Sequence, residues 1–465
     1  MSQLRVRALQ VCLVLAAVGC GASDAQEKPK PTQAPPAPAA PAKPPPAAPA
    51  KLAPPAEAPA ALPEPVRVQN PRVAEALRYD PADPLANLET ADALDQRPRA
   101  KGKVDVPKRG CAILEDPRPV WPEAGIATLA AGGGGEFVVA GYSTRGSEER
   151  LFVVRVSQAG RLEPVATETL KAPHTVKRVA GPGLAADTSQ GITVAFTDGQ
   201  GKLLMQRLRG GTTGAAATRE LAQGVDTRFT PAVAYAKRGA LIAYTLGTTP
   251  MRSMLLRLDP KGEMIATHDI TPAAMGAAAP AFVVGASPPV IVTADARSGL
   301  SPIARVALDV EGKPGTPEVA VPVGMMSQPP ELAAAQSGAG TYIGYAGIGS
   351  AATSALGVVK VAPKVGAPEA LVKGTAYGAL HLDAAASKHA VFFAMDAPIT
   401  AGKAPQHEIH VVRLDAQGTG PVLRIAAASG DATHASIARG QDESVGVVFS
   451  AQDGVYFARL TCAAD

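Results

Sequence analysis

The chain has 465 residues and carries 45 Lys and Arg against 41 Asp and Glu, and from residue 104 onward the balance is 32 basic to 31 acidic side chains. A nucleic-acid-binding domain normally shows a basic cluster, and no such cluster stands out here, so we exclude nucleic acid as a partner. Aromatic residues make up 4% of the chain, with a single tryptophan. This scarcity disfavours carbohydrate, because stacking sites for sugars or bases need aromatic rings.

The first 19 residues have the pattern of a secretory signal peptide. Arg5 and Arg7 precede an apolar stretch of 12 residues, 8–19, which is too short to cross ~30 Å of hydrocarbon as a helix. Residues 1–19 are therefore expected to direct export and to be removed. Ordinary cleavage after Ala25, which would release a soluble protein, is the alternative.

The residues at the end of this stretch are Ala17, Val18, Gly19 and Cys20. They resemble the lipobox of bacterial lipoproteins, in which small residues precede an acylated cysteine, although Leu is commonest at the position of Ala17. The resemblance implies that Cys20 is lipidated, becomes the new amino terminus and anchors the protein to a membrane through two or three acyl chains. Gly21 stands where Asp retains lipoproteins at the inner membrane, so the resemblance implies the cell envelope and its outer membrane as the location.

A Pro- and Ala-rich segment follows, and residues 20–66 are predicted to be a lipidated, disordered tether. Residues 26–66 contain 15 prolines, a composition that cannot bury a core and favours extended polyproline II. At ~3.1 Å per residue, about forty residues could hold a domain up to roughly 120 Å from its lipid, either to reach a partner or as a solubilising stalk.

Apolar residues at near-helical spacing in 67–103 predict a short helical or irregular segment, where Asp80 and Asp83 suit capping or turns better than a metal site.

A pattern repeats over residues 104–465: an apolar strand containing a basic residue, then a polar turn and a glycine. The basic position falls at Arg155, Arg207, Arg257, Ala307, Lys360, Arg413 and Arg459, with weaker copies at 307 and 360, and the spacings are 52, 50, 50, 53, 53 and 46 residues. The third unit has four short apolar segments separated by turn residues, at 231–235, 240–245, 254–258 and 265–270. Four strands per unit at this period resemble the blades of β-propellers, so the pattern predicts an all-β, seven-bladed propeller. A β-sandwich array and an eight-bladed ring are the alternatives.

The cysteine positions predict how the ring closes. Cys12 lies in the signal peptide and Cys20 is the lipid site, which leaves Cys111 and Cys462 on either side of the repeats. The last unit ends after its third strand, so a ring closes if the segment at 111–114 supplies the missing fourth strand and brings the two cysteines together. An exported protein meets an oxidising compartment, and we predict a Cys111–Cys462 disulfide that staples the closure. Two free, buried thiols are the alternative.

No candidate for catalysis or metal binding rises above background. His407, Glu408 and His410 come closest to a metal motif, but residues three apart on a strand point to opposite faces, so a solvated strand start is the preferred interpretation. The loops at 198–201 and 452–454 look like ion-binding loops, yet each falls between apolar strands where a hairpin turn is expected. The Arg repeated in the third strand of the units is predicted to be structural rather than an anion site, because repetition argues against a single site. We therefore predict no catalytic residue, no metal site and no cofactor.

These features lead to three hypotheses about function. The leading one is a non-enzymatic envelope lipoprotein whose propeller presents a face or its central funnel to an envelope protein partner, as a binding or scaffold module. The second is a hydrolase or lyase that acts on a polysaccharide, and the third is a structural component of an outer-membrane assembly with an exposed apolar patch. Three or more carboxylate, His or Arg side chains at one mouth of the channel would favour the enzyme, and a bare channel of Ala and Gly would argue against it.

Overall fold

The structure is a computed structural model in which the chain divides into two units, residues 1–60 and 61–465. The described residues, all in the second unit, are 64–67, 104–175, 178–187, 189, 191–208, 217–273, 275–296, 299–326, 330–348, 354–362, 364–366, 369–372, 381–399, 406–427 and 430–463. The predicted signal peptide, Cys20, nearly all of the tether and residues 68–103 lie outside the described residues, so these predictions remain predictions.

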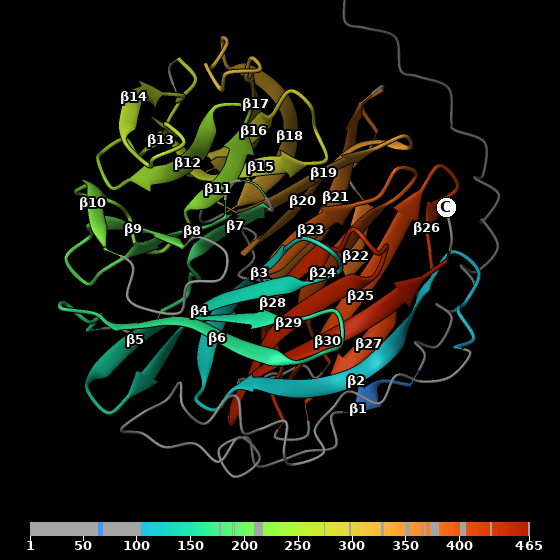
Figure 1. Cartoon of the computed structure of the whole chain (residues 1–465). Helices are drawn as coiled ribbons and strands as arrows, with labels where there is room; N and C mark the ends of the chain where they lie inside the picture. Colours follow the sequence, from blue (N-terminus) through green and yellow to red (C-terminus); the bar gives the residue numbers. More distant parts are fainter. Residues whose placement is uncertain are drawn as a thin grey trace, which may run out of the picture. The chain divides into compact units, whose positions relative to one another are not determined.

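The part of the chain that the structure describes contains β-strands and no helix, and thus no helix that could span a membrane. The strands form sets of four that follow one another along the chain (Figure 1). The first three sets are β3 (Gly125–Ala131), β4 (Phe137–Arg145), β5 (Glu148–Val156) and β6 (Leu162–Thr169); β7 (Gly183–Asp187), β8 (Gly191–Thr197), β9 (Leu203–Leu208) and β10 (Arg219–Ala222); and β11 (Ala232–Ala236), β12 (Gly239–Leu246), β13 (Arg252–Leu258) and β14 (Met264–Asp269).

The later sets have the same order along the chain. They are β15 (Ala277–Val284), β16 (Val290–Asp295), β17 (Gly299–Ala307) and β18 (Glu318–Met326); β19 (Glu331–Ser337), β20 (Gly340–Ile348), β21 (Ser354–Ala362) and β22 (Glu369–Val372); and β23 (Leu382–Ala386), β24 (Val391–Pro398), β25 (His407–Asp415) and β27 (Leu423–Ala426), with the short β26 (Gly418–Thr419) beside β25. A further set joins β28 (Thr433–Arg439), β29 (Val445–Ala451) and β30 (Gly454–Cys462) to β2 (Cys111–Trp121), which comes from the beginning of the domain.

Neighbouring strands within a set are antiparallel, and the sets form a closed series. The first strand of each set contacts the first strand of the next, from β3 through β7, β11, β15, β19 and β23 to β28, and β28 contacts β3. β15 and β19 also pair in parallel, with Val283 opposite Ala334, so two sets share one eight-stranded sheet. The first strands therefore face the middle of the series and the fourth strands face outward.

The second and third strands are largely buried because neighbouring sets cover both of their faces. Every residue of β29, with the sequence VGVVFSA, is buried, as expected for a short, continuous apolar run. The fourth strand β14, by contrast, contains only exposed and half-buried residues. Between the last and first sets, the rings of Trp121 and Phe152 stack with 4.3 Å between their centroids. The core thus lies between the sets.

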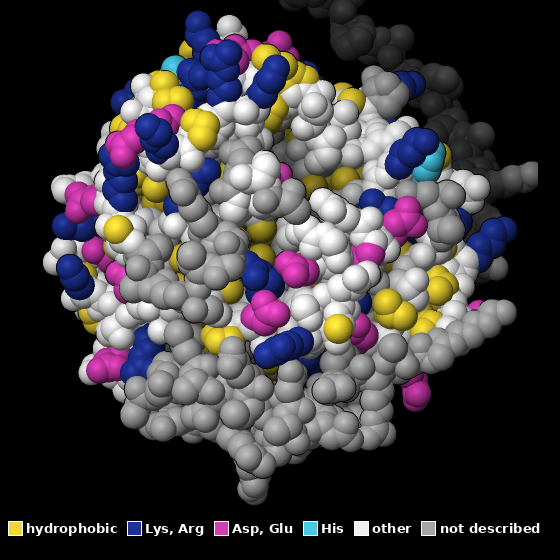
Figure 2. Space-filling view, viewed as in Figure 1, with side chains coloured by type: hydrophobic (Ala, Val, Ile, Leu, Met, Phe, Trp, Pro, Cys, Tyr) yellow, Lys and Arg dark blue, Asp and Glu magenta, His cyan; other side chains and the backbone are white. Residues whose placement is uncertain are grey.

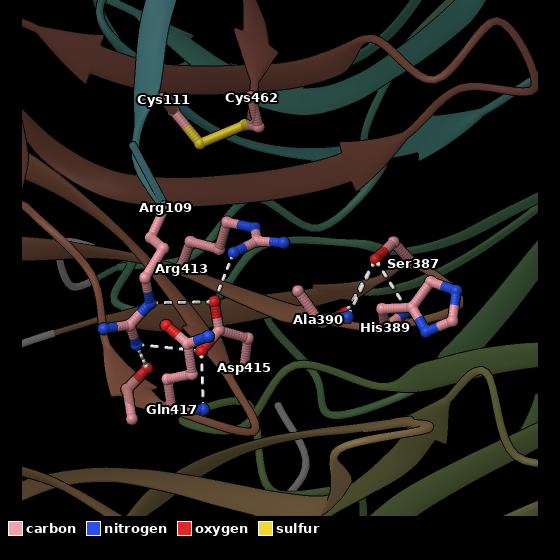
Figure 3. A network of polar contacts seen from close by, with 10 residues as sticks. Arg109, Cys111, Ser387, His389, Ala390, Arg413, Asp415, Gln417 and Cys462 are labelled. Carbon is pink, nitrogen blue, oxygen red and sulfur yellow. Dashed lines mark hydrogen bonds and ion pairs between the residues drawn. A yellow bond between two sulfur atoms is a disulfide. The ribbon is translucent and has the colours of Figure 1, made fainter. Parts of the chain in front are cut away.

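Strand β2 completes the last set by pairing with β30, as Figure 3 shows near the bond between Cys111 and Cys462. These two cysteines lie opposite each other in the register and form a disulfide. Just before β2, the guanidinium of Arg109 donates two hydrogen bonds, of 2.8 and 3.0 Å, to the carboxylate of Asp415, which Arg413 also contacts. A bidentate Arg–carboxylate pair holds its partners in a defined orientation. The closing strand is therefore fastened covalently to β30 and electrostatically to the preceding set.

A short strand precedes the domain. β1 (Val66–Arg67) pairs in parallel with β27, whose outer edge would otherwise leave backbone groups unpaired. Val66 also packs against the hydrophobic core. The predicted boundary between the tether and the following segment, between residues 66 and 67, therefore lies inside this strand, and Val66 is ordered by its pairing with β27.

Candidate functional site

A cavity of about 740 Å³ lies between the first strands of the sets. Residues from β3, β7, β11, β15, β19, β23 and β28 line it, and most are Ala, Gly or larger apolar residues such as Leu129, Val233 and Phe282. Small side chains leave open a space that larger ones would fill in a close-packed interior. Figure 2 shows Lys or Arg and Asp or Glu side chains gathered near the middle of the face in view. The cavity is apolar, with a few polar groups in its wall.

A pair of histidines and a glutamate form the first polar group of the wall. His381 lies immediately before β23, and its Nδ1 is 2.7 Å from Oε2 of Glu331 in β19. Its ring stacks on that of His434 from β28, with 3.9 Å between the centroids. Burial alone would lower the pKa of His381, but the Glu331 carboxylate raises it to about 9. His381 is therefore an imidazolium at neutral pH, and Glu331 balances its charge.

A second layer behind the wall holds His381 in place. Asp396 in β24 is fully buried, and its carboxylate accepts a hydrogen bond from the backbone N–H of His381. Burial raises the pKa of Asp396 to about 6, although His381 opposes the shift. This contact fixes the backbone of His381 and so positions its ring beside the cavity.

Asp383 is the other carboxylate of the group, and it connects three first strands. Its Oδ2 accepts hydrogen bonds from the Ser436 hydroxyl (2.5 Å) and the Ile437 N–H (3.0 Å) in β28, and its Oδ1 accepts one from the Ala384 N–H (2.8 Å). The Ser436 hydroxyl oxygen in turn accepts a hydrogen bond from the N–H of Leu129 in β3. Burial raises the pKa of Asp383 to about 6 against the effect of these bonds. Asp383 therefore joins β23 to β28 and, through Ser436, to β3.

Two residues of the wall have left-handed backbone conformations that non-glycine residues rarely adopt. Ala279 in β15 has a φ of +50° and His434 in β28 has a φ of +55°. Both lie where the pairing with the second strand changes register. Each such conformation costs on the order of 1 kcal/mol or more and persists only where the surroundings hold it. Irregular pairing of this kind changes the direction in which a side chain points, and here it places the ring of His434 against His381.

A separate polar network anchors the connection between β6 and β7. Glu149 accepts hydrogen bonds from both the backbone N–H and the Nδ1 of His174, each at 3.0 Å, and from Arg178. The Arg178 guanidinium lies 3.4 Å above the centre of the Tyr142 ring. Burial alone would raise the pKa of Glu149, but hydrogen bonds from His174 and Arg178 lower it to about 2. The Glu149 carboxylate is engaged by both residues of the connection, so we assign the network a structural role.

The residues that came closest to a metal motif are not at a solvated strand start, and that prediction is wrong. His407, Glu408 and His410 are 7%, 2% and 3% exposed. His407 Nδ1 is 2.9 Å from Asp431, and the Glu408 carboxylate is 2.7 Å from Arg424. Burial, together with the charge of Arg424, lowers the pKa of His410 to about 4. Among the described residues, no three His, Cys, Asp or Glu side chains are placed to hold a metal ion.

The loop at 198–201 forms the hairpin turn that its position predicts. The Asp198 carboxylate accepts hydrogen bonds from the N–H groups of Gln200 (2.9 Å) and Lys202 (3.0 Å), which is ordinary turn chemistry. In the loop at 452–454, Asp453 accepts a hydrogen bond from the Tyr456 hydroxyl at 2.8 Å. Both loops connect neighbouring antiparallel strands.

The arginines repeated in the third strands are structural, as predicted. Three of them reach a carbonyl oxygen in the turn between the third and fourth strands of the next set: Arg207 to Asp259 (3.3 Å), Arg257 to Glu311 (3.1 Å) and Arg459 to Ser157 (2.9 Å). Arg155 and Arg413 instead contact carboxylates of their own sets, Glu163 and Asp415. The repeated contact joins consecutive sets at their outer part. It explains why an Arg recurs at these three junctions, since each needs the same link between sets.

Glu331, His381, Asp383, Asp396 and His434 belong to no motif that marks them in the sequence. One signal was nevertheless present, because most second strands carry a buried polar residue at or near their end, after an apolar run. These residues are Ser143, Thr197, Thr245, Asp295, Asp396 and Ser450. Aligning the units on this position would have placed Glu331 and His381 near the start of the first strands of two consecutive units.

No protein-family model and no curated protein matches this chain. Among solved structures, it is similar to the periplasmic gluconolactonase PpgL of Pseudomonas aeruginosa, with 14% identity over 70% of this chain and 88% of that chain and a TM-score of 0.43. AofleA from Arthrobotrys oligospora has 13% identity over 67% and 89%, with a TM-score of 0.42. The β-propeller domain of the Trilobed protease from Pyrococcus furiosus has 11% identity over 72% and 95%, with a TM-score of 0.39.

Likenesses at this level carry no argument about function. The strand pairing itself defines the class of protein: antiparallel four-stranded sheets in a closed series, with the first strand of each sheet innermost, form a β-propeller. Each set is therefore a propeller blade, and the cavity lies at the centre of the ring of blades.

Proposed function

We propose that this chain is an exported lipoprotein of the cell envelope, acylated at Cys20 and held at the outer membrane. Its propeller has seven blades, and β2 and the Cys111–Cys462 disulfide close the ring. Its function is to bind an envelope partner in the central cavity without catalysing a reaction. The cavity carries this proposal, because a volume of about 740 Å³ and an apolar wall with a few converging polar groups are typical of binding sites.

The contacts of the polar groups favour binding over catalysis. His381 Nδ1 is engaged by Glu331, and both oxygens of Asp383 accept hydrogen bonds from the protein itself. A general acid or base must reach the proton that it transfers. Groups that are hydrogen-bonded within the wall in this way determine the shape and the charge of a binding surface.

A hydrolase or lyase that acts on a polysaccharide is the second candidate, favoured by one observation. Glu331, His381, Asp383 and His434 come from the inner parts of three neighbouring blades and line the same cavity. The pKa of Asp383, which burial raises to about 6, lies in a range that suits proton transfer near neutral pH. Turnover of envelope polysaccharides by the purified protein, abolished by Asp383→Asn, would favour this candidate over simple binding.

The anchor is tested by the intact mass of the protein purified from its native membrane. We expect a chain that begins at Cys20 and carries diacylglycerol and acyl groups, and a Cys20→Ser variant that leaves the membrane fraction. A chain that begins at Gln26 without lipid would contradict the lipoprotein proposal.

The binding site is tested by photo-crosslinking in cells. A crosslinking amino acid at Val179, which lines the cavity and is 39% exposed, should capture the partner. The matched control is Ile265 on the outer strand β14, which is 53% exposed. Adducts at Ile265 but not at Val179 would show that the outer surface binds the partner and that the cavity does not.

A further inference from the structure

Asp383 stands at a position of the blade that small residues occupy elsewhere. It pairs with Ala394, two residues before the buried polar residue Asp396 of the second strand. The residues at the corresponding register in other blades are Ala127, Gly183, Ala232, Ala333 and Ser436. A carboxylate therefore replaces a small side chain in the cavity wall of one blade, and the repeat itself does not require it.

Among the described residues, every group that donates a hydrogen bond to the Asp383 carboxylate is uncharged. Its donors are the Ser436 hydroxyl and the backbone N–H groups of Ala384 and Ile437. The largest influence on it from another charged group is that of Glu331, which has the same sign. Asp383 is half-buried, and burial without a nearby cation makes a carboxylate more costly to ionise, so a cation placed beside it gains favourable energy.

The other charged groups that line the cavity already have partners of opposite sign. The pairs are Glu331 with His381 at 2.7 Å, Arg228 with Asp226 at 2.6 Å, and Arg439 with Glu443 at 3.6 Å. Because His381 and Glu331 neutralise each other, they leave the negative charge of Asp383 in place. Among the described residues, the cavity wall therefore offers one carboxylate without a cationic partner.

We infer that the cavity takes a ligand with a cationic amine or guanidinium group on an apolar stem, with the cation against Asp383 and the stem along the apolar wall. This inference rests on the proposed function, because it assigns a ligand class to the same cavity. A free alkylamine has this chemistry, and so does a Lys or Arg side chain of a partner protein. The small and apolar side chains around Asp383 suit the stem, since they bury it without competing polar groups.

The probes are octylamine, octanol and octanoate, which share one stem and differ in charge, and a capped Leu-Lys-Leu peptide. Each is titrated calorimetrically into the full chain at pH 7.5. Octylamine should bind at least about tenfold more tightly than octanol, as expected for a hydrogen bond between charged groups. Octanoate should bind most weakly, because its charge repels Asp383.

The variant that tests the contact is Asp383→Asn, which keeps the shape of the side chain and removes its charge. It should weaken octylamine binding at least about tenfold and leave octanol binding unchanged, so the octanol titration reports that the cavity is intact. The matched control is Asp309→Asn, at the outer turn between β17 and β18, where the carboxylate accepts backbone N–H groups. This control should change neither titration.

Each result bears on a different part of the inference. Equal binding of octylamine and octanol would overturn the cationic ligand while leaving the cavity as a binding site. Failure of all four probes to bind would overturn the proposed function as well. Tighter binding of the peptide than of octylamine would identify a Lys side chain of a partner as the source, and the reverse would identify a free amine. If Asp383→Asn does not fold, the order of the affinities of the three octyl probes for the unmodified protein still shows whether the cavity prefers a cationic ligand.

Discussion

The Cys111–Cys462 disulfide, which joins β2 to β30, gives the sharpest prediction about stability. Replacing Cys111 and Cys462 together by serine leaves the pairing of β2 with β30 in place and removes only the covalent link. The two residues are 351 positions apart, and the chain-entropy model assigns about 6 kcal/mol at 25 °C to a loop of this length. Residual structure in the unfolded chain reduces this value, so it is an upper figure.

This free energy translates into a shift of the unfolding temperature. A domain of roughly 350 residues unfolds with an entropy of about 0.7 kcal/mol/K, so a loss of about 6 kcal/mol lowers the midpoint by about 9 °C at most. We expect a fall of several degrees in the double variant, measured by differential scanning calorimetry.

Reduction supplies the control for this experiment. Adding a reducing agent should lower the midpoint of the unmodified protein by the same amount and should not affect the double serine variant. Identical midpoints for the oxidised protein and the double variant would refute the idea that the disulfide stabilises the closed ring. A midpoint that falls on reduction in both proteins would show that the effect does not come from this bond.

Three further predictions follow from single side chains. Arg459→Met should cost about 3 to 5 kcal/mol in urea unfolding because it strands buried Glu115, which lies 3.2 Å from the guanidinium, whereas the same change at the more exposed Arg155 should cost at most about 1 kcal/mol. Glu331→Gln should change the pH dependence of the melting temperature. In the folded protein the pKa of His381 is raised from 6.5 to about 9, so the stabilisation by Glu331 is complete below pH 6.5 and is lost as the pH rises through 9. The melting temperature of the variant should therefore not fall over this pH range. Gly183→Ala should cost about 1 to 3 kcal/mol, because its Cβ would lie 2.1 Å from a backbone oxygen of the neighbouring blade.

The strands could be predicted well from the sequence because turn residues bound each apolar run. In the third unit, the predicted segments 231–235, 240–245, 254–258 and 265–270 correspond to Ala232–Ala236, Gly239–Leu246, Arg252–Leu258 and Met264–Asp269. The missing fourth strand of the last unit was equally informative, since a closed ring needs a strand from elsewhere and β2 occupies that place. Period and strand count are local properties of the chain, and local sequence determines them.

Burial could not be predicted in the same way, because it depends on neighbouring blades and connections. His407, Glu408 and His410 look like a polar strand start when β25 is considered alone. In the fold, two residues that follow later in the chain pair with two of them: Arg424 with Glu408, and Asp431 with His407. The cavity wall also depends on register, and the irregular pairing around Ala279 and His434 changes which side chains of β15 and β28 face inward.

Asp383 and Asp396 show how the repeat separates structural residues from functional ones. Burial raises the pKa of both to about 6, and both accept backbone hydrogen bonds, so neither property distinguishes them. Their positions in the strand register of the blades do distinguish them. The position of Asp396 is polar in most blades and joins strands within or between blades, as the contact of Thr245 with the N–H of Ala279 does. The position of Asp383 carries small residues elsewhere, so the repeat as a whole does not require its carboxylate, although in its own blade this carboxylate also joins β23 to β28. A repeat protein needs its assembly contacts in every repeat, so a carboxylate that stands at this register in one blade supports the ligand contact that we infer for Asp383.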